Sequence, residues 1–220
     1  MLCWFSMKYG VDIAVRRADD LDKLMLEEVV AYTARGETPT VLDIGCGAGG
    51  QAKRLASFGA KVTAVDVSDY SAEFTVISKE LRSEGAGTVT FVKADFISWL
   101  NNTSSSEFDI VCCQRTLHYL RYIEARHLLK ELRKRTKGNL YLSVTGATSA
   151  IAESYPALSM SIAKRFAKLS SKAQEVFSIT APLCVYHEEE VSAILKDTDW
   201  NIIQFRVSDF GNIKVVATLR

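Results

Sequence analysis

Short apolar runs alternate with amphipathic stretches between residues 40 and 144. The short runs are rich in β-branched residues and almost continuously apolar, which is typical of strands covered on both faces. They predict strands at residues 40–44, 61–65, 88–92, 108–113 and 139–144. The stretches at 50–57, 71–83 and 122–134 predict helices. Because parallel strands need long crossovers, this alternation indicates an α/β fold with a doubly wound, mostly parallel sheet.

Three segments depart from this alternation. Residues 201–207 and 212–219 are strand-like runs separated by only four residues, so they predict an antiparallel hairpin that brings the sheet to seven strands. The first 38 residues, with apolar positions on one helical face, predict a helical cap. Residues 147–186 follow the fifth strand, and we expect them to form a helical cover over the substrate. The apolar positions at helical spacing in that cover are Leu158, Ile162, Phe166 and Leu169.

The length of the chain favours a single domain. Its 220 residues leave little room for two independent cores. We therefore expect a cap (1–38), a cofactor-binding core (39–146), the cover (147–186), and a last helix with the hairpin (187–220). No internal repeat divides the chain further.

The composition narrows the possible partners. A hydrophobic content of 48% is that of a globular chain, and a formal net charge of +1 gives no field to attract nucleic acid or an anionic membrane. No apolar run approaches the roughly 20 residues needed to cross a bilayer. Five cysteines, an odd number without disulfide or C-x-x-C spacing, indicate reduced thiols and a cytoplasmic protein. The oligomeric state is not encoded in these features.

Candidate chemistry begins in the loop after the first strand. Gly45, Gly47 and Gly49 connect that strand to a helix, and glycine permits positive φ and close approach of a ligand. The start of the helix offers free N–H groups to an anion. Since Gly45, Gly47 and Gly50 also satisfy G-x-G-x-x-G, a dinucleotide site remains an alternative at this point.

Three acids are expected at the same edge of the sheet. Asp66 lies about twenty residues after the glycines, where a carboxylate can accept from both hydroxyls of a ribose. Asp43 stands where dinucleotide sites usually have an apolar residue, and it can hold a cationic amino-acid moiety or order the loop. Asp95 follows the third strand, where it can accept from an exocyclic amine. We expect all three to reach one crevice.

At this point the sequence resembles the class I S-adenosylmethionine-dependent methyltransferases, over residues 40–144 and the terminal hairpin. The family's glycine motif resembles Asp43-Ile44-Gly45-Cys46-Gly47-Ala48-Gly49, and its two binding acids resemble Asp66 and Asp95. The resemblance implies the Rossmann-like methyltransferase fold. It also implies S-adenosylmethionine as cofactor and S-adenosylhomocysteine as product. The cofactor-binding residues it implies are Asp43, Gly45, Cys46, Gly47, Gly49, Asp66, Val67, Asp95, Phe96 and Gln114.

Departures from the family narrow the acceptor. Residues 114–117 contain no proline, which argues against the enzymes that methylate base amino groups, and neither Cys112 nor Cys113 follows a proline as a cytosine-directed nucleophile would. Asp109 begins the fourth strand rather than ending it, so we predict no metal. A small-molecule acceptor, methylated on O, N or S, fits best.

One residue is a candidate catalyst. His118 follows the fourth strand near the expected position of the transferred methyl, and a histidine there can act as general base or as a structural residue of the loop. Two other functions stay open: a nicotinamide-dependent oxidoreductase, and a cofactor-binding subunit without activity of its own.

Overall fold

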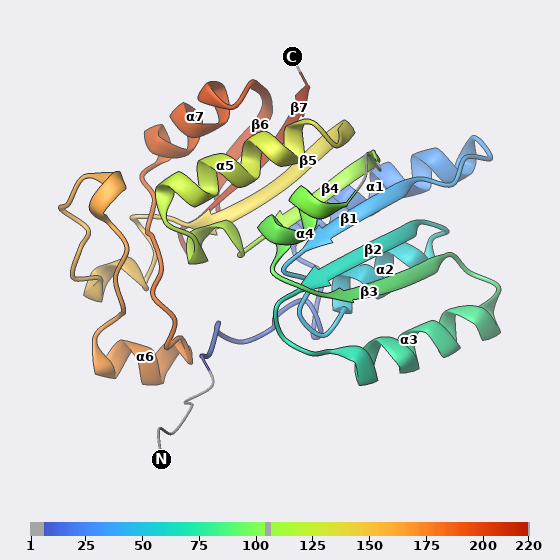
Figure 1. Ribbon diagram of the computed structural model, residues 1–220, viewed down its shortest axis with the longest axis horizontal. Coiled ribbons are helices and arrows are strands. Elements are labelled where there is room, and N and C mark those ends of the chain that lie inside the picture. The colour runs from blue at the N-terminus through green and yellow to red at the C-terminus, as the bar shows by residue number, and fades with distance from the viewer. Residues whose placement is uncertain (1–6, 104–106, 220) are drawn as a thin grey trace.

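The computed structural model describes residues 7–103 and 107–219, and its centre is a seven-stranded sheet in the order β3-β2-β1-β4-β5-β7-β6 (Figure 1). All the strands run in one direction except β7, which is antiparallel to β5 and β6. The predicted doubly wound sheet with a C-terminal hairpin is therefore confirmed. The strands are β1 (Thr40–Ile44), β2 (Lys61–Asp66), β3 (Thr88–Lys93), β4 (Phe108–Gln114), β5 (Thr136–Thr145), β6 (Trp200–Val207) and β7 (Asn212–Leu219).

Helices cover both faces of the sheet and bury a separate apolar core on each. One core includes Met25, Leu55 and Leu81, which come from the three helices of the first face. The other includes Leu128 and Ile194, from helices of the opposite face. The first face is covered by α1 (Asp20–Ala34), α2 (Gly50–Ser57) and α3 (Ser71–Glu84), and the second by α4 (Phe96–Asn102), α5 (Tyr122–Arg133) and α7 (Glu188–Asp197).

The cover at 147–186 differs from the expected helical form. Its regular structure is limited to α6 (Ser171–Phe177) and two 3-10 turns, Ala152–Ser154 and Ile162–Lys164. Buried Arg165 explains the irregular path, because its guanidinium donates to the carbonyl oxygens of Met160 (2.7 Å) and Val185 (3.0 Å) and pairs with Glu190 at 2.6 Å. Carbonyls used in this way are not available to a continuous helix.

The predicted apolar stripe of the cover is consequently split between two cores. Leu158 and Leu169 pack in a small core of the cover itself, whereas Ile162 and Phe166 pack against the core beneath α5 and α7. The Phe166 ring lies under the guanidinium of Arg121, 5.7 Å from its centroid. The four positions therefore do not form one continuous apolar face.

The N-terminal cap also differs from the prediction, because only α1 is helical in its described part. Residues 7–19, which we call the strap, run without a helix from the cover to the start of α1. Tyr9 forms an antiparallel bridge with Ile179 of the cover, and Gly10 donates to the carbonyl of Ser178 at 3.0 Å. Asp19 then begins α1 by accepting from the free N–H groups of its first turn.

The described residues contain no helix that is both long and apolar enough to cross a membrane. Four cysteines, at 46, 112, 113 and 184, are buried free thiols. Cys3 lies outside the described residues. Burial raises the pKa of Cys113 and of Cys184 to about 12, so these thiols stay protonated.

Candidate functional site

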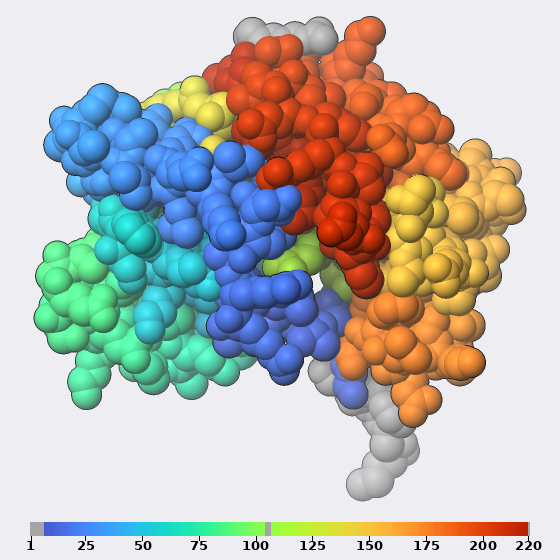
Figure 2. Space-filling model, turned by 180° about the vertical axis from the view of Figure 1, so that it is seen from behind, coloured from blue at the N-terminus to red at the C-terminus, as the bar shows by residue number. Residues whose placement is uncertain are grey.

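A cavity of about 840 Å³ opens at the carboxyl ends of β1 and β4. The strand order reverses between these strands, with β2 and β3 on one side and β5, β7 and β6 on the other. Ligands bind at such switch points in open α/β sheets because the loops there diverge and leave a crevice. Figure 2 shows the hollow between the blue N-terminal and the red C-terminal segments. The strap, the cover and the β6–β7 turn all contribute to its walls.

The glycine loop (residues 45–49) has the backbone that its sequence predicts. Gly45, Gly47 and Gly49 have φ values of +71°, +53° and +84°, in the region that L side chains rarely adopt. A Cβ on Gly47 would lie 2.5 Å from a carboxylate oxygen of Asp12 in the strap. That same oxygen accepts from the N–H of Ala48 at 3.0 Å, so a carboxylate already lies against this loop.

Asp66 is locked to the loop at the end of β2. One carboxylate oxygen accepts from the N–H of Gly47 at 3.0 Å and the other from the N–H of Ser68 at 2.8 Å. Asp66, Gly47 and Ser68 all line the cavity. The exposed side chain of Val67 lines it as well. The carboxylate therefore has a fixed orientation before any ligand arrives, as a residue that binds hydroxyl groups requires.

A second acidic group lies deeper in the cavity wall. Asp43 is buried, and no hydrogen bond within the described residues satisfies its Oδ2. Burial raises the pKa of Asp43 to about 7, with smaller contributions from neighbouring carboxylates, first that of Asp22. Asp22 is also buried with a raised pKa, and it accepts from the side-chain amide of Gln114, whose own oxygen has no partner in the described chain.

These buried acceptors fit a cationic ligand group. Unsatisfied carboxylate and amide oxygens in a protein interior are costly unless a donor reaches them. An ammonium group supplies three donors and a positive charge. Asp22, Asp43 and Gln114 all line the cavity, so these acceptors lie in the wall that such a group would contact.

Asp95 is placed differently from the prediction that three acids meet in one crevice. It is exposed, does not line the cavity, and caps α4 by accepting from the N–H of Ser98 at 2.8 Å. The free amide at the start of the helix satisfies this short carboxylate locally. Phe96, the next residue, does line the cavity. Gly49 is not a lining residue, because Phe74 of α3 packs against it.

Cys46 lines the cavity beside the glycines but has no nucleophilic character. Burial is the main cause that raises the pKa of its thiol far above the ordinary value, and Asp43 and Asp66 add to this effect. A thiol that stays protonated is a poor nucleophile. Cys46 therefore contributes backbone and volume to the loop.

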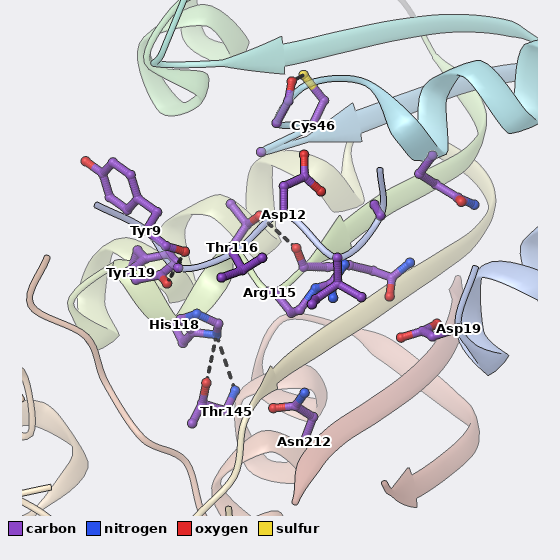
Figure 3. Close-up of a pocket in the computed structure, with 18 of the residues that line it drawn as sticks. Tyr9, Asp12, Asp19, Cys46, Arg115, Thr116, His118, Tyr119, Thr145 and Asn212 are labelled. Atoms are coloured by element: carbon purple, nitrogen blue, oxygen red, sulfur yellow. Dashed lines mark hydrogen bonds between the residues drawn. The ribbon is translucent and has the colours of Figure 1, made fainter. Parts of the chain in front are cut away.

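His118 lies on the opposite wall, in a 3-10 turn after β4 (Figure 3). Its Nδ1 accepts from the N–H of Thr145 at 3.2 Å, and its ring packs edge-on against Tyr119. Burial lowers the pKa of His118 to about 3, and the positive charge of Arg115 acts in the same direction. The ring is thus neutral and a weak proton acceptor, which disfavours the general-base role expected from its position.

Several wall residues were not predicted, because they come from segments without a motif. Asp12 belongs to the strap and Asp22 to α1, while Arg115 is part of the loop after β4. A D-x-x-D capping pattern marks Asp22 as the third residue of a helix, yet only the packing of α1 on the sheet brings it to the cavity. The cover and the hairpin turn add Ile151, Val176, Phe177, Ile179 and Phe210.

Across the described residues, no three histidine, cysteine or acidic side chains are grouped as metal ligands would be.

Comparison with known proteins adds two findings. Residues 41–139 match the family model described as the methyltransferase domain. The fold is similar to many solved structures at identities too low to indicate more than the fold. The magnesium protoporphyrin IX methyltransferase of Synechocystis, solved with bound SAM, has 20% identity and a TM-score of 0.59, covering 96% of this chain and 88% of that one.

Two further structures are similar to a comparable extent. A SAM-dependent methyltransferase of Methanosarcina mazei has 22% identity and a TM-score of 0.60, over 83% of this chain and 92% of that one. The 1,6-didemethyltoxoflavin-N1-methyltransferase of Burkholderia thailandensis has 15% identity and a TM-score of 0.60, over 88% and 77%.

Proposed function

We propose that this chain, whose residues 41–139 match the methyltransferase domain family and whose sheet has the Rossmann-like methyltransferase fold, transfers the methyl group of S-adenosylmethionine to an oxygen, nitrogen or sulfur atom of a small molecule. The product of the cofactor is S-adenosylhomocysteine. One observation carries the proposal: the glycine loop holds Asp66 at the same cavity whose wall contains Asp43, with its buried and unsatisfied carboxylate oxygen.

The cavity residues fit the chemical groups of the cofactor. Asp66 is positioned to accept from the ribose hydroxyls, and the buried acceptors of Asp22, Asp43 and Gln114 suit the α-ammonium group. Phe96 and Val67 supply apolar surface for the adenine ring. Asp95 stays a proposed contact only if it leaves its capping position, because its carboxylate is bound to Ser98.

The remaining residues would act mainly by alignment and exclusion of water. S-adenosylmethionine supplies an already electrophilic methyl group, so the protein needs to hold the acceptor atom in line with it. The strap and the cover close the two sides of the cavity through the contact of Tyr9 with Ile179. Neutral His118 would orient the acceptor through hydrogen bonds rather than remove a proton from it. Methyl transfer then proceeds with an acceptor atom that needs no deprotonation.

Two features support a small acceptor. A volume of about 840 Å³ lies within the range of small-ligand pockets. The similar proteins named above include enzymes of a porphyrin and of a toxoflavin precursor, both small molecules. We propose the cytoplasm as the compartment, on the basis of the unpaired cysteines of the described chain.

Calorimetry with S-adenosylhomocysteine tests the proposal. The wild-type protein is expected to bind it, and Asp66→Asn is expected to weaken binding about 10- to 100-fold, because charge-assisted hydrogen bonds contribute roughly 1.5–3 kcal/mol. Asp69→Asn is the matched control, since Asp69 is an exposed acid on the same loop that pairs with Lys93. Equal affinity in all three proteins, or preferential binding of NADH, would contradict the proposal.

A further inference from the structure

We propose that Arg115 binds a carboxylate of the methyl acceptor, so that the substrate class is a small carboxylic acid with an apolar or aromatic body. This inference rests on the proposed function and assigns the acceptor half of the same cavity. Arg115 follows β4, lines the cavity and is half-buried (Figure 3). Within the described chain its guanidinium has no hydrogen-bond or ion-pair partner.

The backbone of Arg115 is held in an unusual conformation. Its φ is +54°, a left-handed value that costs a branched or long side chain more than it costs glycine or asparagine. The N–H of Arg115 donates to the carbonyl oxygen of Ser143 at 2.9 Å and lies 3.1 Å from the Ser143 hydroxyl, so β5 fixes this conformation. Strained non-glycine residues persist where the surroundings enforce them, and they concentrate at functional sites.

The other charges near this half of the cavity are already neutralised or lie at the rim. Buried Lys214 pairs with both Asp19 and Asp20. Arg17 and Asp209 are exposed lining residues. Among the described residues that line the cavity, the guanidinium of Arg115 is therefore the cation left to meet an anion inside. One guanidinium balances the single charge of a carboxylate in a two-pronged hydrogen bond. A phosphate dianion would need a second unengaged cation.

Aromatic and aliphatic side chains line the same cavity as this charge. Tyr9 and Tyr119 pack edge to face with centroids 5.0 Å apart, and the Tyr119 hydroxyl donates to the Tyr9 carbonyl at 2.6 Å. The cover adds Phe177 and Ile179, and the hairpin turn adds Phe210. A flat apolar body can pack among these groups while its carboxylate reaches Arg115.

The cofactor's own carboxylate is the competing source of the same chemistry. The glycine loop offers it a separate position, because the N–H of Ala48 already donates to a carboxylate oxygen, that of Asp12. We therefore assign Arg115 to the acceptor. A cofactor fragment without a carboxylate, 5′-methylthioadenosine, distinguishes the two sources.

The experiment compares carboxylates with their amides. Binding of 4-hydroxybenzoate and indole-3-acetate, each against its carboxamide, is measured by calorimetry at saturating S-adenosylhomocysteine. In the wild-type protein at least one acid is expected to bind 10-fold or more tightly than its amide, and Arg115→Gln is expected to remove this preference. Arg115→Lys is expected to restore part of it, and Arg17→Gln to leave it unchanged.

Each contrary result has a distinct meaning. If S-adenosylhomocysteine fails to bind the wild-type protein, the proposed function fails and the inference with it. If it binds, but acids and amides do not differ or neither acid binds, the inference alone is overturned. If Arg115→Gln weakens S-adenosylhomocysteine but not 5′-methylthioadenosine, the guanidinium holds the cofactor's carboxylate and the assignment to the acceptor is wrong. Unchanged affinity of the variant for S-adenosylhomocysteine shows that it is folded.

Discussion

Asp43 and His118 are both buried in the cavity wall, and burial shifts their pKa values in opposite directions. The pKa of the carboxyl rises and that of the imidazole falls, because desolvation disfavours the charged form of each group. Their contributions to stability therefore have opposite slopes with pH, and single variants are needed to separate them.

Asp43 is expected to destabilise the protein at alkaline pH. Its pKa is about 7 in the folded chain against an ordinary value of 3.8, so between these values the folded state binds the extra proton and the free energy of unfolding falls as pH rises. The free energy of unfolding of Asp43→Asn, relative to that of the wild type, is expected to rise by a few kcal/mol when the pH is raised from about 4 to about 8. This follows from roughly 1.4 kcal/mol for each unit by which the pKa is shifted. Urea denaturation at the two pH values measures the gain. A difference between variant and wild type that does not change with pH would show an unshifted carboxyl.

His118 is expected to leave the pH–rate profile flat near pH 6.5. Its folded pKa of about 3 lies below the ordinary 6.5, so its stabilising contribution is complete above pH 6.5 and is lost as the pH falls towards 3. His118→Asn keeps an acceptor for the Thr145 N–H and is expected to retain turnover within about 10-fold, whereas loss of a general base costs about 10²- to 10⁴-fold. If the rate of the wild type, but not that of the variant, rises with pH around an apparent pKa of 6.5, His118 is a general base after all.

The strap and the cover determine access to the cavity at the scale of elements. Neither has a sequence motif, and each is tied to the other rather than to the sheet alone, through Lys8 with Thr180 and Tyr9 with Ile179. Both segments line the cavity, and variants in each measure their separate effects on cofactor binding and on acceptor binding.

The strap is expected to compete with the cofactor at the start of α2. The Asp12 carboxylate accepts from the Ala48 N–H, a donor well placed for a ligand carboxylate, and would repel one nearby. Asp12→Ala is therefore expected to tighten S-adenosylhomocysteine binding roughly 3- to 10-fold, from about 1 kcal/mol for one hydrogen bond. The affinity of Asp12→Asn, which keeps an acceptor without the charge, should lie between that of the wild type and that of Asp12→Ala. Weaker binding in Asp12→Ala would instead make Asp12 a ligand contact.

The cover is expected to select the acceptor through Phe177 rather than through Phe166. Phe177 lines the cavity, whereas Phe166 packs on the core beneath α5. Phe177→Ala is expected to raise the KM of an acceptor about 10-fold and leave cofactor affinity unchanged, because it removes apolar contact area from one half of the cavity. Phe166→Ala is the control, with lower stability and an unchanged KM. If Phe177→Ala weakened the binding of cofactor and acceptor equally, Phe177 would contact both ligands and would not select the acceptor alone.

At the scale of the whole molecule, the cavity joins segments that are far apart in sequence, from Tyr9 to Lys214. Ligand binding should therefore stabilise the domain as a unit. S-adenosylhomocysteine at about 100 times its Kd adds about 2.7 kcal/mol, which corresponds to roughly 5–10 °C in Tm for a chain of this size. Thermal unfolding with and without ligand measures the shift, and Asp66→Asn should lose about half of it or more at the same ligand concentration. A wild-type Tm that does not respond to ligand would contradict binding.

The sequence by itself determined the sheet and the glycine loop. Runs such as 40–44 and 61–65 are typical of strands buried on both faces, and their spacing leaves room for helical crossovers. Positive φ at Gly45 and Gly47 followed from the residue type, because other residues are strained there. The location of Asp66 beside the glycine loop followed from its position at the end of a parallel strand, because such strand ends meet at one edge of the sheet.

Only the tertiary structure decided the cover and the residues that complete the cavity. The spacing of Leu158 to Leu169 suits a helix, but buried Arg165 uses backbone carbonyls from two segments, and no local pattern encodes that demand. Asp95 stands where the sequence predicts a ligand contact, but in the structure its carboxylate caps α4 and does not line the cavity. Asp22 and Arg115 line the same cavity only because helix packing and the β4–β5 register bring distant segments together, and side-chain periodicity carries no information about such long-range packing.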